Sequence, residues 1–112
     1  MHIQTLINNI NPFVPFASEQ DANNFLKNYT PDDCYALLTA MYIGRDHIHS
    51  NKITPDYDTV LSSGSFNRYY HQDTASLNEI PRILYEKNTN LTSYYESFIR
   101  CATNSGIDLN YF

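Results

Sequence analysis

The stretch TPDDCYALLTAMYIG, residues 30–44, carries a complete set of helix signals. Thr30 is a favoured N-cap residue, and Pro31 suits the first helical position. An apolar stripe follows at helical spacing, formed by Cys34, Leu37, Leu38, Met41 and Tyr42. Gly44 supplies the expected C-terminal stop. We therefore expect the strongest helix of the chain over residues 30–44.

Shorter helices are expected on both sides of this stretch. Pro81 must lie in the first turn of its helix, because an interior proline breaks the backbone ladder. Asn90 is expected to cap the last helix and Gly106 to end it. The phenylalanines of segment 11–17 are expected to be held against the domain. Apolar spacing places the helices at residues 3–10, 18–26, 54–61, 77–87 and 91–105, with a turn or short helix within 65–76.

No run of the sequence alternates apolar and polar residues with the period of a strand. The expected fold class is therefore all-α. We expect a compact bundle of five to six short helices that forms a single helical domain over residues 1–112.

The charge balance of the chain limits the classes of partner that it can bind. Its 112 residues hold twelve acidic and seven basic side chains, a formal net charge of -5. Phosphate binding needs clustered Lys and Arg, so nucleic acid and an anionic membrane are argued against as main partners. Neither a secretion signal nor an apolar run of about 20 residues is present, so we expect a cytoplasmic protein.

The two cysteines, Cys34 and Cys101, are too few for a four-ligand metal site. Both fall on apolar helix faces, which favours buried free thiols over the alternative of a disulfide. No cofactor and no metal are expected.

Beyond the end of the strongest helix lies a dense polar cluster, formed by Arg45, Asp46, His47 and His49. A His-x-His pair beside a carboxylate has the groups for acid–base catalysis, but two imidazoles are too few for a metal. Near a helix C-terminus these residues also complement the helix dipole. Helical nucleases of one widespread class pair an Arg with a later His, and Arg45–His49 and Arg68–His71 are similar at a shorter spacing.

Most of the negative charge lies in the middle of the chain, where residues 18–73 hold eight acidic and four basic side chains. Four of these acids occupy expected helix starts, where each stabilises its helix by about 0.3–1 kcal/mol. The alternative is a face for a basic protein partner, made by two aligned helix N-termini. That face would comprise Asp32, Asp33, Asp56, Tyr57 and Asp58.

The run Leu-Leu-Thr-Ala-Met-Tyr-Ile-Gly-Arg at residues 37–45 resembles the helix end Leu-Val-Ala-Leu-x-Trp-Leu-Gly-Arg-Gly of a family of small uncharacterised bacterial proteins, domain-of-unknown-function family 3775. A second similarity to that family covers Ile83-Leu84, Leu91, Tyr94-Tyr95-Glu96 and Gly106-Ile107. The resemblance implies a compact helical protein and carries no catalytic residue onto this chain. It draws attention to Gly44-Arg45 as either a helix cap with a structural arginine or a binding site.

These observations predict a non-enzymatic binding protein. Its most concrete form is an immunity protein that binds and neutralises the basic nuclease-type domain of a bacterial toxin. Two alternatives stay open. One is a structural or regulatory protein that self-associates through exposed tyrosines, and the other is a metal-dependent or nuclease-like enzyme. The enzyme would use Arg45, His47 and His49, with Asp46 and His71 as further candidates.

Overall fold

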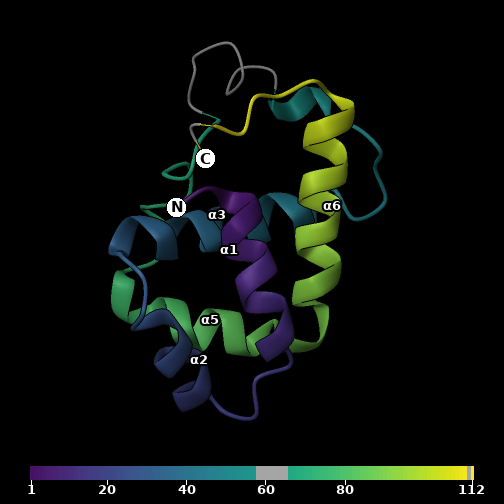
Figure 1. Ribbon diagram of the computed structural model, residues 1–112. Coiled ribbons are helices and arrows are strands. Elements are labelled where there is room, and N and C mark those ends of the chain that lie inside the picture. Colours follow the sequence, from purple (N-terminus) through teal and green to yellow (C-terminus); the bar gives the residue numbers. More distant parts are fainter. Residues whose placement is uncertain (58–65, 111) are drawn as a thin grey trace.

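The helix α3, Pro31–Asp46, is the element on which most of the other helices pack (Figure 1). The computed structural model describes residues 1–57, 66–110 and 112. Three helices are the main packing partners of α3. Those three are α1 (Ile3–Ile10), α5 (Ile80–Glu86) and α6 (Leu91–Asn104). Helix α2 (Glu19–Leu26) packs mainly against α5 and also meets α3, where the Cys34 thiol lies 3.9 Å from the Leu26 carbonyl oxygen.

The described residues contain helices and turns but no strand, which confirms the all-α class. The radius of gyration of 13.2 Å is that of a compact chain of this length. Within the same residues, no helix is both long enough and apolar enough to cross a membrane.

The middle of helix α3 is buried on all sides rather than along one stripe. Every residue from Ala36 to Met41 is buried, although only part of this run belongs to the expected apolar face. Thr39 is fully buried, and its hydroxyl donates a hydrogen bond of 2.7 Å to the carbonyl oxygen of Arg68. The middle turns of α3 therefore have no free face, and their small side chains decide how closely the neighbouring helices approach.

Gly44 does not end α3, which contradicts the expected stop. The helix continues to Asp46, and Gly44 instead faces the backbone of Tyr94 in α6. A Cβ atom at Gly44 would lie 1.8 Å from the Tyr94 carbonyl oxygen, far inside van der Waals contact. The glycine is therefore needed for the close approach of two helices and not for a turn.

We expect Gly44→Ala to lower the free energy of unfolding by about 3 kcal/mol, because α6 must move away from α3. Urea denaturation measured by circular dichroism checks this. Gly106→Ala is the matched control, since no atom lies within 4 Å of a Cβ there and only its φ of 70° is strained. We expect that control to cost about 1 kcal/mol. Equal losses in the two variants would contradict the packing role of Gly44.

The remaining helix ends agree with the sequence. Ser18 and Thr30 accept capping hydrogen bonds of 3.1 and 3.2 Å from the backbone N–H three residues on. Pro81 lies in the first turn of α5, and Gly106 follows the end of α6. Asn90 occupies the N-cap position of α6, as expected, but its side chain makes no capping hydrogen bond. The chain enters α6 through a 3-10 turn, η4 (Asn88–Asn90).

The less regular segments are mostly turns. Of the helix expected at residues 54–61, the structure describes a 3-10 turn, η2 (Pro55–Tyr57), and residues 58–61 lie outside the described part. Backbone hydrogen bonds at Tyr70, Gln72 and Thr74 close successive turns after Phe66. The expected helix at 77–87 opens with a further 3-10 turn, η3 (Leu77–Glu79), before α5.

Cys34 and Cys101 are buried free thiols, as expected. Burial raises the pKa of Cys34 to about 11, so its thiol stays protonated at neutral pH.

Phe16 is 5% exposed, but Phe13, in the 3-10 turn η1 (Asn11–Phe13), is 59% exposed. The expectation that both rings are held against the domain is therefore wrong for Phe13.

Arg68 joins three distant parts of the chain. Its guanidinium donates hydrogen bonds to the Asp33 carboxylate at 3.1 Å and to the carbonyl oxygens of Met1 and Phe112. The N-terminal ammonium donates to the same Asp33 oxygen at 3.0 Å. Burial acts to raise the pKa of Asp33, but the hydrogen bonds from the ammonium, Arg68 and Thr30 together lower it.

We expect Asp33→Asn to lower the free energy of unfolding at pH 7 by about 3 kcal/mol, because Arg68 is then left partly buried without its counter-charge. The pKa of Asp33 is lower in the folded than in the unfolded state. Its contribution is therefore complete above the ordinary value of 3.8 and is lost as the pH falls through the folded value. Urea denaturation between pH 2 and pH 7 should show a flatter profile for the variant. The exposed neighbour change Asp32→Asn should cost less than about 0.5 kcal/mol.

Candidate functional site

The two Thr-Pro-Asp segments lie at opposite ends of α3. Asp32 is in the first turn of this helix, whereas the Tyr57 hydroxyl donates a hydrogen bond of 2.8 Å to Asp46, its last residue. Asp32 and Asp46 are fourteen positions apart, which corresponds to about 21 Å of helix. The two segments therefore do not align their N-terminal ends, and that part of the sequence-based prediction is wrong.

The five residues of the expected acidic face have different environments. Asp33 is 5% exposed, and its charge is matched by Arg68 and the N-terminal ammonium, so it does not offer a carboxylate to a partner. Asp32 and Asp56 are exposed. Tyr57 is half-buried, and Asp58 lies outside the described residues.

The polar side chains at the end of α3 do not meet at one site. His47 is fully buried, and its Nε2 accepts a hydrogen bond of 3.0 Å from the backbone N–H of Thr54. Its Nδ1 lies 2.7 Å from the carbonyl oxygen of Ile43 and therefore carries the donated proton. With both ring nitrogens engaged, His47 joins the loop to α3 and does not pair with the exposed His49.

The other members of this cluster make local contacts. Arg45 lies over the Tyr42 ring, with 4.9 Å between guanidinium carbon and ring centroid, and forms a 3.6 Å ion pair with Asp46. Arg68 is held by Asp33 and does not contact His71. No group of three His, Cys, Asp or Glu side chains in the described part of the chain is placed to hold a metal ion.

A row of aromatic rings covers the outer side of α3. Tyr57 packs on His47, with ring centroids 4.9 Å apart, and lies 5.9 Å from Tyr70. The His71 ring lies 4.8 Å from Tyr70 and 4.9 Å from Tyr42. The backbone under this row is anchored at Thr39, which accepts a hydrogen bond from the His71 N–H at 3.3 Å.

Carboxylates lie beside two of the tyrosines on this side of α3. The Asp32 carboxylate raises the pKa of the neighbouring Tyr69 phenol. Burial raises the pKa of Tyr57, and its hydrogen bond to Asp46 adds to the effect. The result is an exposed strip along α3, the tyrosine–carboxylate surface, formed by Asp32, Asp46, Tyr57, Tyr69 and Tyr70.

Tyr69 and Tyr70 were not among the site residues expected from the sequence. They are 40% and 39% exposed, although each is large and apolar enough to favour burial. A signal was present, because two adjacent tyrosines in a polar turn segment cannot both point into the core. Other tyrosines in the chain occur at helical spacing, which is typical of core residues, so this pair did not stand out.

His71 lies beneath this surface in an unusual environment. Its Nδ1 is 3.0 Å from the Thr74 hydroxyl, whereas its Nε2 is buried and has no hydrogen-bond partner among the described residues. Burial lowers the pKa of this imidazole, Asp46 acts in the opposite direction, and Arg45 adds to the lowering.

We expect an NMR titration to give His71 a pKa below its ordinary value of 6.5, and Asp46→Asn to lower it further. Because the folded state disfavours the charged imidazole, the unfolded state binds the proton more tightly. Stability should therefore fall as the pH drops below 6.5. His71→Gln should flatten this part of the profile. A pKa that rises in the Asp46→Asn variant would contradict the assignment.

Comparisons of the chain with protein-family models, with curated proteins and with solved structures found no match. The resemblance to family 3775 therefore stays a prediction.

Proposed function

We propose that this chain is a small non-catalytic binding protein whose tyrosine–carboxylate surface receives a basic protein partner. The observation that carries the proposal is the pair of adjacent exposed tyrosines, Tyr69 and Tyr70, placed between two carboxylates on one side of α3. The partner is proposed to be the nuclease-type domain of a bacterial toxin, with this chain as its immunity protein in the cytoplasm.

Tyrosine supports this proposal through its contact area. A phenol ring offers a large surface with few rotatable bonds, and tyrosine is enriched among the residues that dominate binding energy. The Tyr57 ring is restrained by its hydrogen bond to Asp46 before any partner arrives. Less side-chain entropy is then lost when a complex forms.

The carboxylates support a basic partner. An ionised carboxylate can accept about four hydrogen bonds, so the exposed Asp32 offers acceptor sites to Arg or Lys. Asp46 retains acceptor sites after receiving the Tyr57 phenol and pairing with Arg45. Domains that bind nucleic acid are themselves basic, because they must neutralise phosphates. The net charge of -5 then accelerates association with such a domain.

Two features of the chain favour this proposal over the alternatives. Both ring nitrogens of His47 are engaged in hydrogen bonds that join the loop to α3, which leaves the enzyme hypothesis without one of its groups. A symmetric pair of copies meeting through this surface would bring the same acidic patch together across the axis. Like charges in such an interface are unfavourable, so a different, basic partner fits better than self-association.

We expect a gene beside the one for this chain to encode a protein with a basic nuclease-type domain. Co-expression should protect a bacterial host from that domain, and light scattering should show a 1:1 complex. A host that dies equally fast with and without this chain would contradict the immunity proposal.

In that complex, the double change Tyr69→Ala and Tyr70→Ala should raise the Kd by about 30-fold, because both anchors are lost. Asp32→Asn with Asp46→Asn should slow association several-fold at low salt and much less at high salt. Surface plasmon resonance measures both effects. Tyr85→Ala and Glu86→Gln are matched controls, since both side chains are exposed on α5 and lie outside this surface. If the controls weaken binding as much, the partner uses another face.

A further inference from the structure

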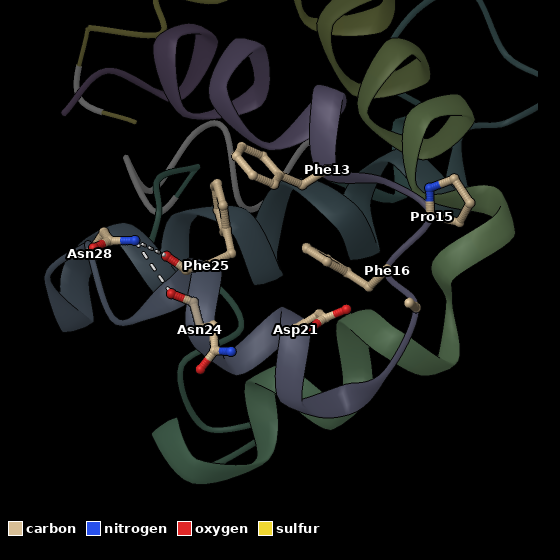
Figure 2. A pocket seen from close by; sticks show the side chains of 8 residues that line it. Phe13, Pro15, Phe16, Asp21, Asn24, Phe25 and Asn28 are labelled. Atoms are coloured by element: carbon tan, nitrogen blue, oxygen red, sulfur yellow. Dashed lines mark hydrogen bonds between the residues drawn. The ribbon is translucent and has the colours of Figure 1, made fainter.

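A second recognition feature lies on α2, where the segment after α1 leaves a groove beside the helix (Figure 2). Its volume of about 410 Å³ is within the range of small-ligand sites. Phe13, Phe16 and Phe25 form its apolar wall, and Figure 2 shows their three rings around one opening. None of these residues belongs to the tyrosine–carboxylate surface.

The groove is held open by fixed contacts. Asn88, before α6, receives the Phe16 N–H on Oδ1 and donates from Nδ2 to the Phe16 carbonyl oxygen, both at 2.6 Å. The Phe25 ring is placed between the other two, with centroids 5.3 Å from Phe13 and 6.1 Å from Phe16. The walls are therefore formed before any ligand binds.

The edge of the groove carries one charge. Asp21 and Asn24 of α2 line it together with Asn28, which follows the helix. The Asn28 amide donates to backbone oxygens of α2 at 3.3 Å (Figure 2). Asn24 Oδ1 accepts from Gln20 at 2.9 Å. The Asp21 carboxylate, in contrast, takes part in no hydrogen bond or ion pair with any described residue. No cation lines the groove.

We infer that this groove binds an extended protein segment in which an arginine adjoins an aromatic residue. The aromatic side chain fills the space between the phenylalanines, and the guanidinium pairs with Asp21. Arginine fits better than lysine, because its planar group both stacks on an aromatic face and pairs with a carboxylate through two hydrogen bonds. Phe13, which is 59% exposed, supplies such a face on the wall of the same groove.

Three blocked dipeptides test this inference on the full chain without knowledge of any natural partner. The probe is acetyl-Phe-Arg-amide, the neutral match is acetyl-Phe-Gln-amide, and acetyl-Gly-Arg-amide lacks the ring. We expect the probe to shift backbone amide signals of the groove in 15N–1H NMR spectra, with a Kd of about 1 mM. Each of the other two dipeptides should bind about fivefold more weakly.

Two variants locate the contacts. Asp21→Asn should remove the preference for arginine over glutamine and leave the binding of the neutral dipeptide unchanged. Phe13→Ala should weaken the two phenylalanine dipeptides alike. Glu19→Gln is the control, because it removes one charge from the same helix without lining the groove. It should leave the arginine preference in place.

The inference is overturned if no saturable shift occurs up to about 10 mM, or if the shifts centre on Tyr69 and Tyr70. It is also overturned if the arginine preference survives in Asp21→Asn, because the carboxylate is then not the site of the guanidinium. The proposed function does not depend on these results, since its own test uses different residues.

Discussion

The contact between α3 and α6 at Gly44 is the constraint on which the rest of the molecule depends. With no side chain at this position, the Tyr94 backbone lies directly against α3. The same approach brings the Tyr95 hydroxyl within 3.1 Å of the Leu37 carbonyl oxygen. It also places the end of α6 beside the loop that leaves α3, where Arg100 donates to the Ser50 carbonyl oxygen at 2.9 Å. One close helix pair thus fixes where the loop carrying η2 must run.

The tyrosine–carboxylate surface follows from this arrangement. On one side, the loop held by α6 presents Tyr57 to the end of α3. On the other side, buried Thr39 holds the turn segment that carries Tyr69 and Tyr70. Burying a threonine hydroxyl without a hydrogen-bond partner costs free energy, and the two backbone hydrogen bonds of Thr39 offset that cost. The same two bonds position the segment, so the exposed rings rest on a backbone set by the core.

The acidic side chains separate into two groups by their contacts. Asp33 is matched by cations and Glu79 caps η3 at Ser76, so both serve the fold. Asp32 is exposed beside Tyr69, Asp46 receives the Tyr57 phenol and pairs with Arg45, and Asp21 lies at the edge of an aromatic groove without a cation. Asp32 and Asp21 leave their charge available for a basic partner, and Asp46 shares its charge with Arg45. Acidity in this chain therefore has two physical uses, and the partners of each carboxylate distinguish them better than its position in the sequence.

The sequence by itself determined the helices and most of their ends, because apolar spacing and caps such as Ser18 and Thr30 act within a few residues. It also indicated the buried thiols. Only the tertiary structure decided what Gly44, Asp33 and His47 do, since their partners are Tyr94, Arg68 and Thr54, and a sequence carries no distance to such partners. For the same reason the candidate site lies along α3 and not at two aligned helix starts. A residue's neighbours along the chain predict its local conformation, whereas its exposure depends on everything that packs around it.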